Sequence, residues 1–404
     1  MRLNQLLLMT LGATMIFACK REGCTDQSAI NYDEKAKNDD GSCQYEDGQG
    51  PNGASNAVEL SGTIDTPETL ENVFTNSSSV DYIVTGDLYI DAALTIEPGV
   101  RIVMEAGNDI TINSGGSINA TGTSDDKIYI VGEQNVSGYW GYIRFNNSNN
   151  PNNKLIHTNI KNAGGSTYRE ATVHLDGNSR LIMQNTSISM SERNGFVVGS
   201  KDAKLVDFEN NYFDECNYPI RLSSLEQLSE VDFNTDFVND NVYNVLYVGG
   251  ATIEQPITIN RVNGSVLLDD ISYIESSVVF NEGLDVRFAP GARIDVRSTG
   301  SLNSNGTSGN RITLTGDQST EGYWGYIRIQ SNNSDNIFEY TDVSYGGGSS
   351  YRDANIYVEG GAQFSMGNCS VNHSASYGVD GSGTYTDLGG NTYSGNTNDD
   401  NTLN

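Results

Sequence analysis

The stretch GYWGYIR at residues 138–144 returns letter for letter at residues 322–328, an offset of 184 in the numbering. Shorter signals return in the same order on both sides of it: GSIN (116–119) as GSLN (300–303), and GGSTYR (164–169) as GGSSYR (347–352). A further pair, EPGVRI (97–102) and APGARI (289–294), matches at an offset of 192, which predicts a turn-sized insertion near residues 107–109 of the first copy. Repetition over this distance indicates that the chain contains an internal duplication.

Short apolar segments of period two fill both copies. Examples are DITI (109–112), KIYIV (127–131) and RITL (311–314), and Gly, Asn, Asp or Ser residues bound them. Such residues favour sharp turns, and no long segment of helical period follows Ala18. Strands this short, recurring at a period of roughly 20 to 25 residues, are typical of a β-solenoid. A β-sandwich is the alternative, but its usual size of about 100 residues is smaller than one copy.

The fold prediction is therefore an all-β, parallel β-solenoid or β-helix built from two internal copies. We expect the first copy at residues 61–260 and the second at residues 261–404, where an Asn-rich tail is expected to fray.

Composition restricts the partners. The 23 Lys and Arg residues against 52 Asp and Glu residues give a net charge of −29. A surface of this sign repels nucleic acids and anionic bilayers, so we expect no nucleic-acid partner. No apolar run reaches the roughly 18 residues that a membrane-spanning helix needs.

The first residues have the pattern of an export signal. Arg2 supplies positive charge, and an apolar run to Ala18 is followed by Cys19. The sequence IFAC (16–19) resembles a bacterial lipobox, which implies a signal peptide at residues 1–18 and lipidation of Cys19. We expect an outer-membrane lipoprotein on the cell surface or the periplasmic face, attached to the membrane through the lipid alone. The alternative is an ordinary signal peptide and a secreted protein.

Residues 19–45 form a short Cys-bounded segment, and a spacer rich in Gly and Asn is expected at residues 46–60. If Cys19 carries lipid, Cys24 and Cys43 are the natural disulfide pair, which leaves Cys216 and Cys369 as buried single thiols. The pattern GCTD…DDGSC resembles a module of surface and secreted proteins of Bacteroidota. Its acidic residues could bind Ca²⁺, although turn and cap formation is the favoured interpretation; they are Asp26, Asp33, Asp39 and Asp40. No other cofactor is expected.

The succession LTIEPGV (94–100), GSINATGT (116–123) and GYWGYI (138–143) carries a wider resemblance. It resembles the right-handed parallel β-helix surface proteins of Bacteroidota and related bacteria, which have a pectin-lyase-like fold. This resemblance implies the fold but not the activity, because the fold hosts polysaccharide lyases, hydrolases and adhesins.

Strand alternation predicts that Ile143 and Phe145 point inward and that Tyr142 and Arg144 point outward. The other candidate ligand-binding residues are Tyr168, Arg169, Tyr326, Arg328, Tyr351 and Arg352. Tyrosine rings beside guanidinium groups can stack on sugars and bind hydroxyls or uronates. The alternative is that these residues only stack on one another. Trp140 and Trp324 are expected to fill corners of the core.

Catalytic patterns are weak. A lyase could use Arg169 with Glu170 and Asp176, or Arg352 with Asp353 and Glu359, but an enzyme is expected to have such a group once. We therefore expect a non-enzymatic rod, without catalytic residues, for adhesion or glycan binding, whose partner is an extracellular glycan or another cell-surface molecule. A polysaccharide lyase or glycoside hydrolase and a structural spacer without ligand are the alternatives.

Overall fold

The computed structural model describes residues 32–37, 57–74, 76, 78–398 and 400–403. The expected signal peptide, the lipidation of Cys19, the Cys24–Cys43 disulfide, and Asp26, Asp39 and Asp40 lie outside these residues. Residues 58–404 form one compact unit, separate from residues 1–57.

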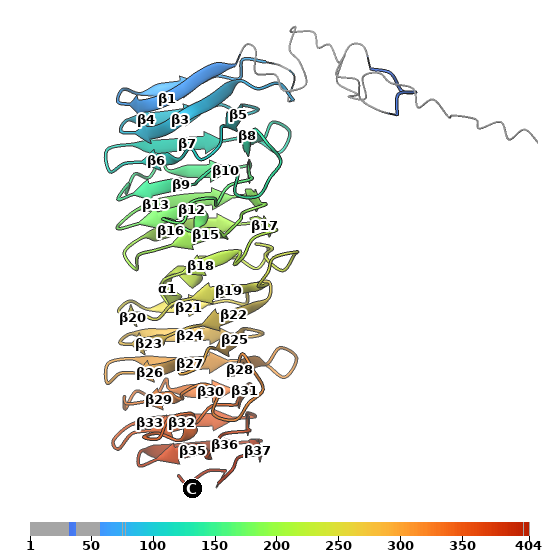
Figure 1. Ribbon diagram of the computed structural model, residues 1–404. Helices are drawn as coiled ribbons and strands as arrows, with labels where there is room; N and C mark the ends of the chain where they lie inside the picture. The colour runs from blue at the N-terminus through green and yellow to red at the C-terminus, as the bar shows by residue number, and fades with distance from the viewer. Residues whose placement is uncertain (1–31, 38–56, 75, 77, 399, 404) are drawn as a thin grey trace, which may run out of the picture. The chain divides into compact units, whose positions relative to one another are not determined.

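Residues 58–404 form a parallel β-solenoid of the right-handed type, with about 13 turns (Figure 1). The prediction of an all-β solenoid is confirmed, and α1 (Leu225–Leu228) is the one α-helix among the described residues. No helix in the described part of the chain has the length and hydrophobicity to cross a membrane.

In the N-terminal half of the solenoid, three columns of stacked strands enclose the core. Two long strands, β1 (Val58–Ile64) and β3 (Tyr82–Ile90), span the first two columns. The first column continues with β5 (Arg101–Met104), β8 (Ile128–Gly132), β11 (Thr158–Lys161), β14 (Ser187–Ser189) and β17 (Tyr212–Asp214). The third column consists of β2 (Glu68–Leu70), β4 (Ala93–Ile96), β7 (Ser117–Thr121), β10 (Lys154–Ile156), β13 (Arg180–Gln184) and β16 (Lys204–Glu209).

The second column runs to the end of the solenoid, and we call it the through column. Its N-terminal part is β6 (Ile110–Ile112), β9 (Ile143–Asn146), β12 (Ala171–Asp176), β15 (Asn194–Val198) and β18 (Ile220–Leu222). Its C-terminal part is β19 (Val245–Val248), β22 (Ser265–Leu268), β25 (Asp285–Phe288), β28 (Ile312–Gly316), β31 (Thr341–Ser344), β34 (Ser370–Asn372) and β37 (Thr392–Ser394).

Two new columns complete the C-terminal half. One consists of β20 (Thr252–Ile253), β23 (Ile271–Ile274), β26 (Arg293–Val296), β29 (Ile327–Ile329), β32 (Ala354–Val358) and β35 (Tyr377–Gly381). The other consists of β21 (Ile257–Ile259), β24 (Ser277–Asn281), β27 (Ser301–Asn305), β30 (Ile337–Glu339), β33 (Gln363–Gly367) and β36 (Thr384–Gly389).

Alternation along the strands builds the core. Ile143 and Phe145 of β9 point inward as predicted and stack in register on Val173 and Leu175 of β12. Each coil thus buries its apolar side chains against the coils before and after it, as in other solenoids.

The two tryptophans fill the interior as predicted. Both are fully buried, and each indole N–H donates to a backbone carbonyl: that of Trp140 to Lys161 at 2.7 Å, and that of Trp324 to Ser344 at 2.8 Å. The buried indole groups therefore have hydrogen-bond partners. Cys216 and Cys369 are buried free thiols, in agreement with the sequence analysis.

A left-handed residue forms the corner between the third and first columns. His157, Asn185 and Asn210 occupy this corner in successive coils, with φ angles of 47°, 50° and 54°. Asparagine tolerates this conformation better than most residues, which helps to explain its frequency between the strands.

Strands of the second copy stack in a different column from their equivalents in the first copy, so the second copy is displaced by one face of the solenoid. The Ile102–Ile130 pairing of β5 with β8 returns as the Val286–Leu314 pairing of β25 with β28, at the same offset of 184 for both partners. However, β5 belongs to the first column, whereas β25 belongs to the through column. Equivalent residues of the two copies therefore lie in different sheets.

This register corrects the predicted insertion near residues 107–109. Ile102 and Ile110 correspond to Val286 and Ile294 at the same offset, so EPGV (97–100) corresponds to NEGL (281–284) and not to APGA (289–292). The two similar Pro-Gly turns follow different strands. Their likeness reflects shared turn chemistry and not shared position in the repeat.

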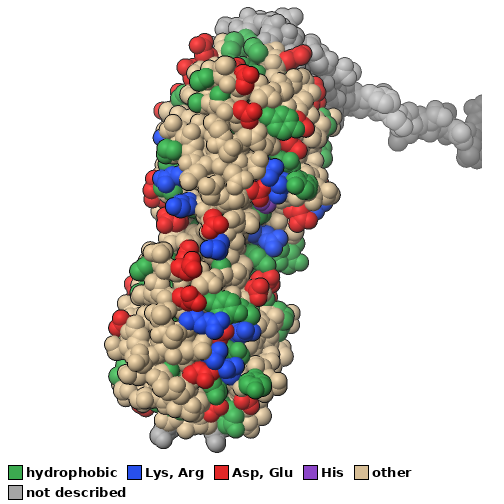
Figure 2. Space-filling model, turned by 90° about the vertical axis from the view of Figure 1, so that its left-hand side faces the viewer, with side chains coloured by type: hydrophobic (Ala, Val, Ile, Leu, Met, Phe, Trp, Pro, Cys, Tyr) green, Lys and Arg blue, Asp and Glu red, His purple; other side chains and the backbone are tan. Residues whose placement is uncertain are grey.

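The displacement takes place in residues 215–264, which we call the junction. There the first column ends in single bridges from Tyr212 to Asp236 and from Asp236 to Asn263. The third column ends with a bridge from Phe208 to Val231, next to α1. Figure 2 shows the surface hollowed about half-way along the stack.

Candidate ligand-binding groove

The predicted residues of the first copy form an ion-pair cluster on the through column. Asp176 at the end of β12 accepts from Arg144 of β9 at 2.6 Å and from Arg169 of the preceding loop at 3.1 Å. The three side chains are about four-fifths buried or more. One carboxylate therefore holds two guanidinium groups. The charges of the cluster pair with one another and do not need a ligand.

His174 completes the cluster. Its Nε2 atom lies 3.0 Å from Asp176, and its Nδ1 atom lies 3.1 Å from the carbonyl oxygen of Arg169. Burial lowers the pKa of His174, although the Asp176 carboxylate acts in the opposite direction. The ring thereby holds the loop that carries Tyr168 and Arg169 against the sheet.

The second copy repeats this cluster with two changes. Glu359 replaces the aspartate and contacts Arg328 at 2.6 Å and Arg352 at 2.8 Å, and Tyr357 stands in place of the histidine. Partial burial acts to raise the pKa of Glu359, but hydrogen bonds from Arg352 and Arg328 lower it overall. The repeated cluster is thus an ion-paired feature of both copies.

The outward placement of Tyr142 and Tyr326 is wrong. Only 8% and 5% of their surfaces are exposed. The strand begins at Ile143, so Tyr142 belongs to the preceding turn and does not follow the alternation of the strand. Arg293 and Arg352 lie over the ring of Tyr326 at 5.5 and 5.9 Å, so this ring supports the arginines.

Tyr168 and Tyr351 are the exposed tyrosines of the predicted set, at 71% and 84%. Arg169 lies over the ring of Tyr168 at 4.2 Å. Because of the displacement at the junction, the loops that carry these tyrosines adjoin different columns. They do not form one continuous row along the solenoid.

A hollow of about 530 Å³ lies beside the loop of Tyr168. Its walls come from that loop, from β15, β18 and β19, and from the turn that follows β22; they include Tyr168, Arg169, Arg221, Tyr247 and Asp269. This groove lies where the first copy meets the junction.

A cluster of aromatic rings adjoins the groove. Tyr218 stacks on Tyr243 with 4.5 Å between ring centroids and contacts the edge of Tyr247 at 5.6 Å. Arg221 lies over Tyr247 at 4.2 Å and over Tyr218 at 5.7 Å. Half of the surface of Tyr243 is exposed. Rigid, partly exposed rings of this kind offer large contact area at low entropic cost.

Parallel pairing positions this cluster. Arg221 of β18 pairs directly with Tyr247 of β19, so their side chains project on the same side of the sheet. The Tyr247 hydroxyl donates to the carboxylate of Asp269. Burial, followed by this hydrogen bond, raises the pKa of Tyr247. The ring and hydroxyl are therefore held in place before any ligand arrives.

Sequence reasoning missed Tyr218, Arg221, Tyr243, Tyr247 and Asp269. The available signal was the alternation IRL (220–222) and LYV (246–248), which places Arg221 and Tyr247 outward one coil apart. The internal repeat gives no signal for these residues.

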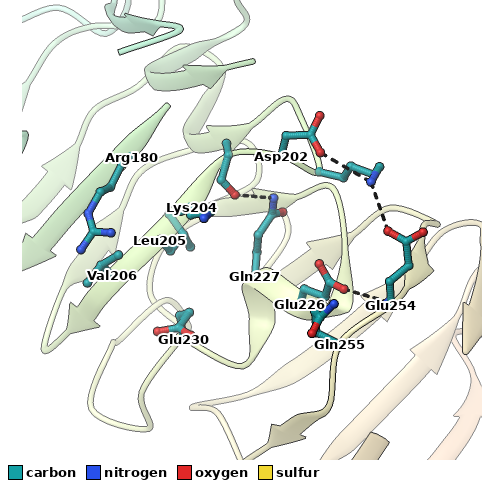
Figure 3. Close-up of a pocket in the computed structure, with 12 residues that line it drawn as sticks. Arg180, Asp202, Lys204, Leu205, Val206, Glu226, Gln227, Glu230, Glu254 and Gln255 are labelled. Atoms are coloured by element: carbon teal, nitrogen blue, oxygen red, sulfur yellow. Dashed lines mark hydrogen bonds and ion pairs between the residues drawn. The ribbon is translucent and has the colours of Figure 1, made fainter. Parts of the chain in front are cut away.

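The junction holds another cavity, of about 700 Å³, next to α1 (Figure 3). Lys201 contacts Asp202 at 3.5 Å and Glu254 at 3.8 Å, and the Gln227 amide donates to the carbonyl oxygens of Ser200 and Ala203. These contacts join the turn before β16, the last strand of the third column, to α1 and to Glu254. The lining has no aromatic ring, which makes this cavity the weaker candidate for a sugar.

Metal ligands do not gather in the described part of the chain, where no three His, Cys, Asp or Glu side chains are suitably placed. Asp33 is the one expected calcium ligand within it, and its carboxylate accepts from the backbone N–H of Lys35 at 2.9 Å. That contact is typical of a turn.

Comparison of the chain with protein-family models, with curated proteins and with solved structures gives no match. The groove is therefore judged on its own geometry.

Proposed function

We propose that this protein is a non-enzymatic glycan-binding solenoid, exported and attached to the outer membrane through lipid on Cys19. The aromatic cluster of Tyr218, Tyr243 and Tyr247 beside the groove carries the proposal. Sugar rings present C–H faces that stack on tyrosines, and their hydroxyls can pair with groups such as Arg169 and Asp269 at the walls.

The shape of the groove supports binding more than catalysis. Three carboxylates line it: Glu170 lies 4.0 Å from Arg193, Asp269 accepts from the Tyr247 hydroxyl, and Asp270 accepts from the backbone N–H of Ile271. Each of these carboxylates has a polar partner within the protein, so we assign them to structure and not to the carboxylate pair of glycoside hydrolysis.

The first test replaces the exposed rings. Tyr168→Ala combined with Tyr243→Ala should weaken binding to the retained glycan by about tenfold or more, since each stacked ring is worth roughly 0.5–1.5 kcal/mol. Binding is measured by calorimetry on glycans first selected by retention on an immobilised panel.

Tyr351→Ala is the matched control, because Tyr351 occupies the equivalent loop of the second copy, away from the groove. An equal loss in this variant would support the earlier expectation of one site per copy and would contradict the groove. Absence of binding to every glycan would leave a structural spacer.

The enzymatic alternative rests on the junction cavity, which occurs once and contains Glu226, Glu230 and Glu254. Burial raises the pKa of Glu230, and the nearby Asp207 adds to this. A raised carboxyl pKa suits a general acid. Release of reducing or unsaturated ends from the same glycan panel would favour a hydrolase or a lyase over the binding protein.

The anchor is tested separately. Cys19→Ser removes the thiol that lipid would occupy, so the protein should move from the membrane fraction to the medium. Retention of this variant in the membrane fraction would contradict a lipid anchor on Cys19.

A further inference from the structure

The charges around the groove are nearly all satisfied within the protein. Arg169 and His174 contact Asp176, and Glu170 lies 4.0 Å from Arg193. The remaining acids also have partners: Asp269 accepts from the Tyr247 hydroxyl, and Asp270 accepts from the backbone N–H of Ile271.

Arg221 is the exception. Among the described residues, no carboxylate oxygen lies within 4.0 Å of its side-chain nitrogens. Its neighbours are the rings of Tyr247 and Tyr218, at 4.2 and 5.7 Å. The Arg221 side chain also hydrogen-bonds to that of Tyr247. A guanidinium carries five N–H donors, so others remain for a planar or tetrahedral oxyanion.

Arg101, Arg180, Arg261 and Arg297 of the described chain also lack an ion pair, but Arg221 is the one that lines this groove. The excess of carboxylates offers ion-pair partners, and other arginines of the same face, such as Arg144 and Arg287, have one. The two tyrosines hold the Arg221 side chain in place, so little entropy is lost when its donors bind a ligand.

We propose that the groove selects a glycan that carries an anionic group, either a carboxylate or a sulfate ester, and that Arg221 binds this group. The inference rests on the proposed glycan-binding function and adds the class of sugar. The tyrosines supply stacking that any pyranose can use, and Arg221 supplies the discrimination.

The net negative charge of the protein does not prevent this. At an ionic strength of about 0.15 M the screening length is about 8 Å, so repulsion from distant carboxylates is largely screened. The contact between Arg221 and a ligand oxyanion is much shorter than that length. Short-range pairing therefore dominates at physiological salt.

The experiment compares three oligosaccharide probes of equal length by calorimetry in about 0.15 M NaCl: a uronate polymer fragment, its methyl ester, and a sulfated galactan fragment. We expect the uronate or the sulfated probe to bind at least about tenfold more tightly than the neutral ester, as hydrogen bonds to charged groups commonly contribute. Tighter binding of the uronate probe would identify a carboxylate as the anionic group, and tighter binding of the sulfated probe would identify a sulfate ester.

Arg221→Gln should reduce the ratio of acidic-probe affinity to neutral-ester affinity to about one, because Gln keeps hydrogen-bond donors but carries no charge. Arg261→Gln is the matched control: Arg261 also lies over an aromatic ring, Phe233 at 4.6 Å, but lines a different hollow. Thermal melting of both variants establishes that they are folded.

Equal binding of the three probes, each weakened by loss of Tyr168 and Tyr243, would overturn this inference and leave the proposed function intact. A preference for acidic probes that persists in Arg221→Gln would also overturn it. Failure of every glycan to bind would reject both proposals.

Discussion

At the scale of the residue, Asp109 explains why the first copy of the GYWGYIR motif needs a glycine at position 141. Asp109 accepts from the backbone N–H of Tyr142 at 3.1 Å, and a Cβ atom at Gly141 would lie 1.5 Å from the Asp109 carboxylate. The carboxylate occupies the space that a side chain would need. In the second copy Arg293 takes the place of Asp109, so the contact is specific to the first copy.

Asp109 leads to a prediction on pH and stability. Burial raises its pKa to about 6, from an ordinary value of 3.8 in the unfolded chain. Because the folded state binds this proton more tightly, the group stabilises the fold at low pH, and this contribution is lost as the pH rises through about 6. Asp109→Asn should therefore melt at a higher temperature than the wild type at pH 8, and this difference should narrow as the pH falls below about 6 and nearly vanish near pH 4.

Melting curves between pH 4 and pH 8 measure the effect. Asp125→Asn serves as the control, because Asp125 is exposed and its replacement changes the net charge equally. Parallel curves for the wild type and Asp109→Asn across this range would show that Asp109 does not titrate as described.

Strands are the elements that the sequence predicts best, because period-two alternation survives even in segments of three to five residues. The prediction was correct for Ile143, Phe145 and the two tryptophans. It failed at Tyr142, one residue before β9 begins, since alternation applies only within the strand. Positions just outside short strands are the least predictable.

The displacement of the second copy by one face could not be predicted from the repeat. Equivalent strands keep the same offset in the numbering whichever column they stack on. The repeat therefore does not indicate which column a strand of the second copy joins. The column is determined in the junction, where β19 pairs with β18 of the through column. The same junction brings Tyr218, Tyr243 and Tyr247 together, which explains why the groove occurs once.

Composition and architecture agree for residues 58–404. A solenoid buries a thin core that extends in one direction, so a hydrophobic content of 36% is enough to fill it. Figure 2 shows acidic and basic side chains close to one another over one face. Ion pairs of the solenoid include those of Arg293 with Asp295 and of Arg328 with Glu359. In the aromatic groove, exposed rings gather beside a hollow, and we therefore propose ligand binding there.

Hydrogen–deuterium exchange of the protein with and without a retained glycan tests this placement most directly. We expect slower exchange, on binding, in the loop at residues 164–170 and in the strands and turns at residues 218–223 and 243–250, which surround the groove. Exchange at residues 347–358 of the second copy should not change. Protection confined to the second copy, or equal in both copies, would contradict a single binding site created by the junction.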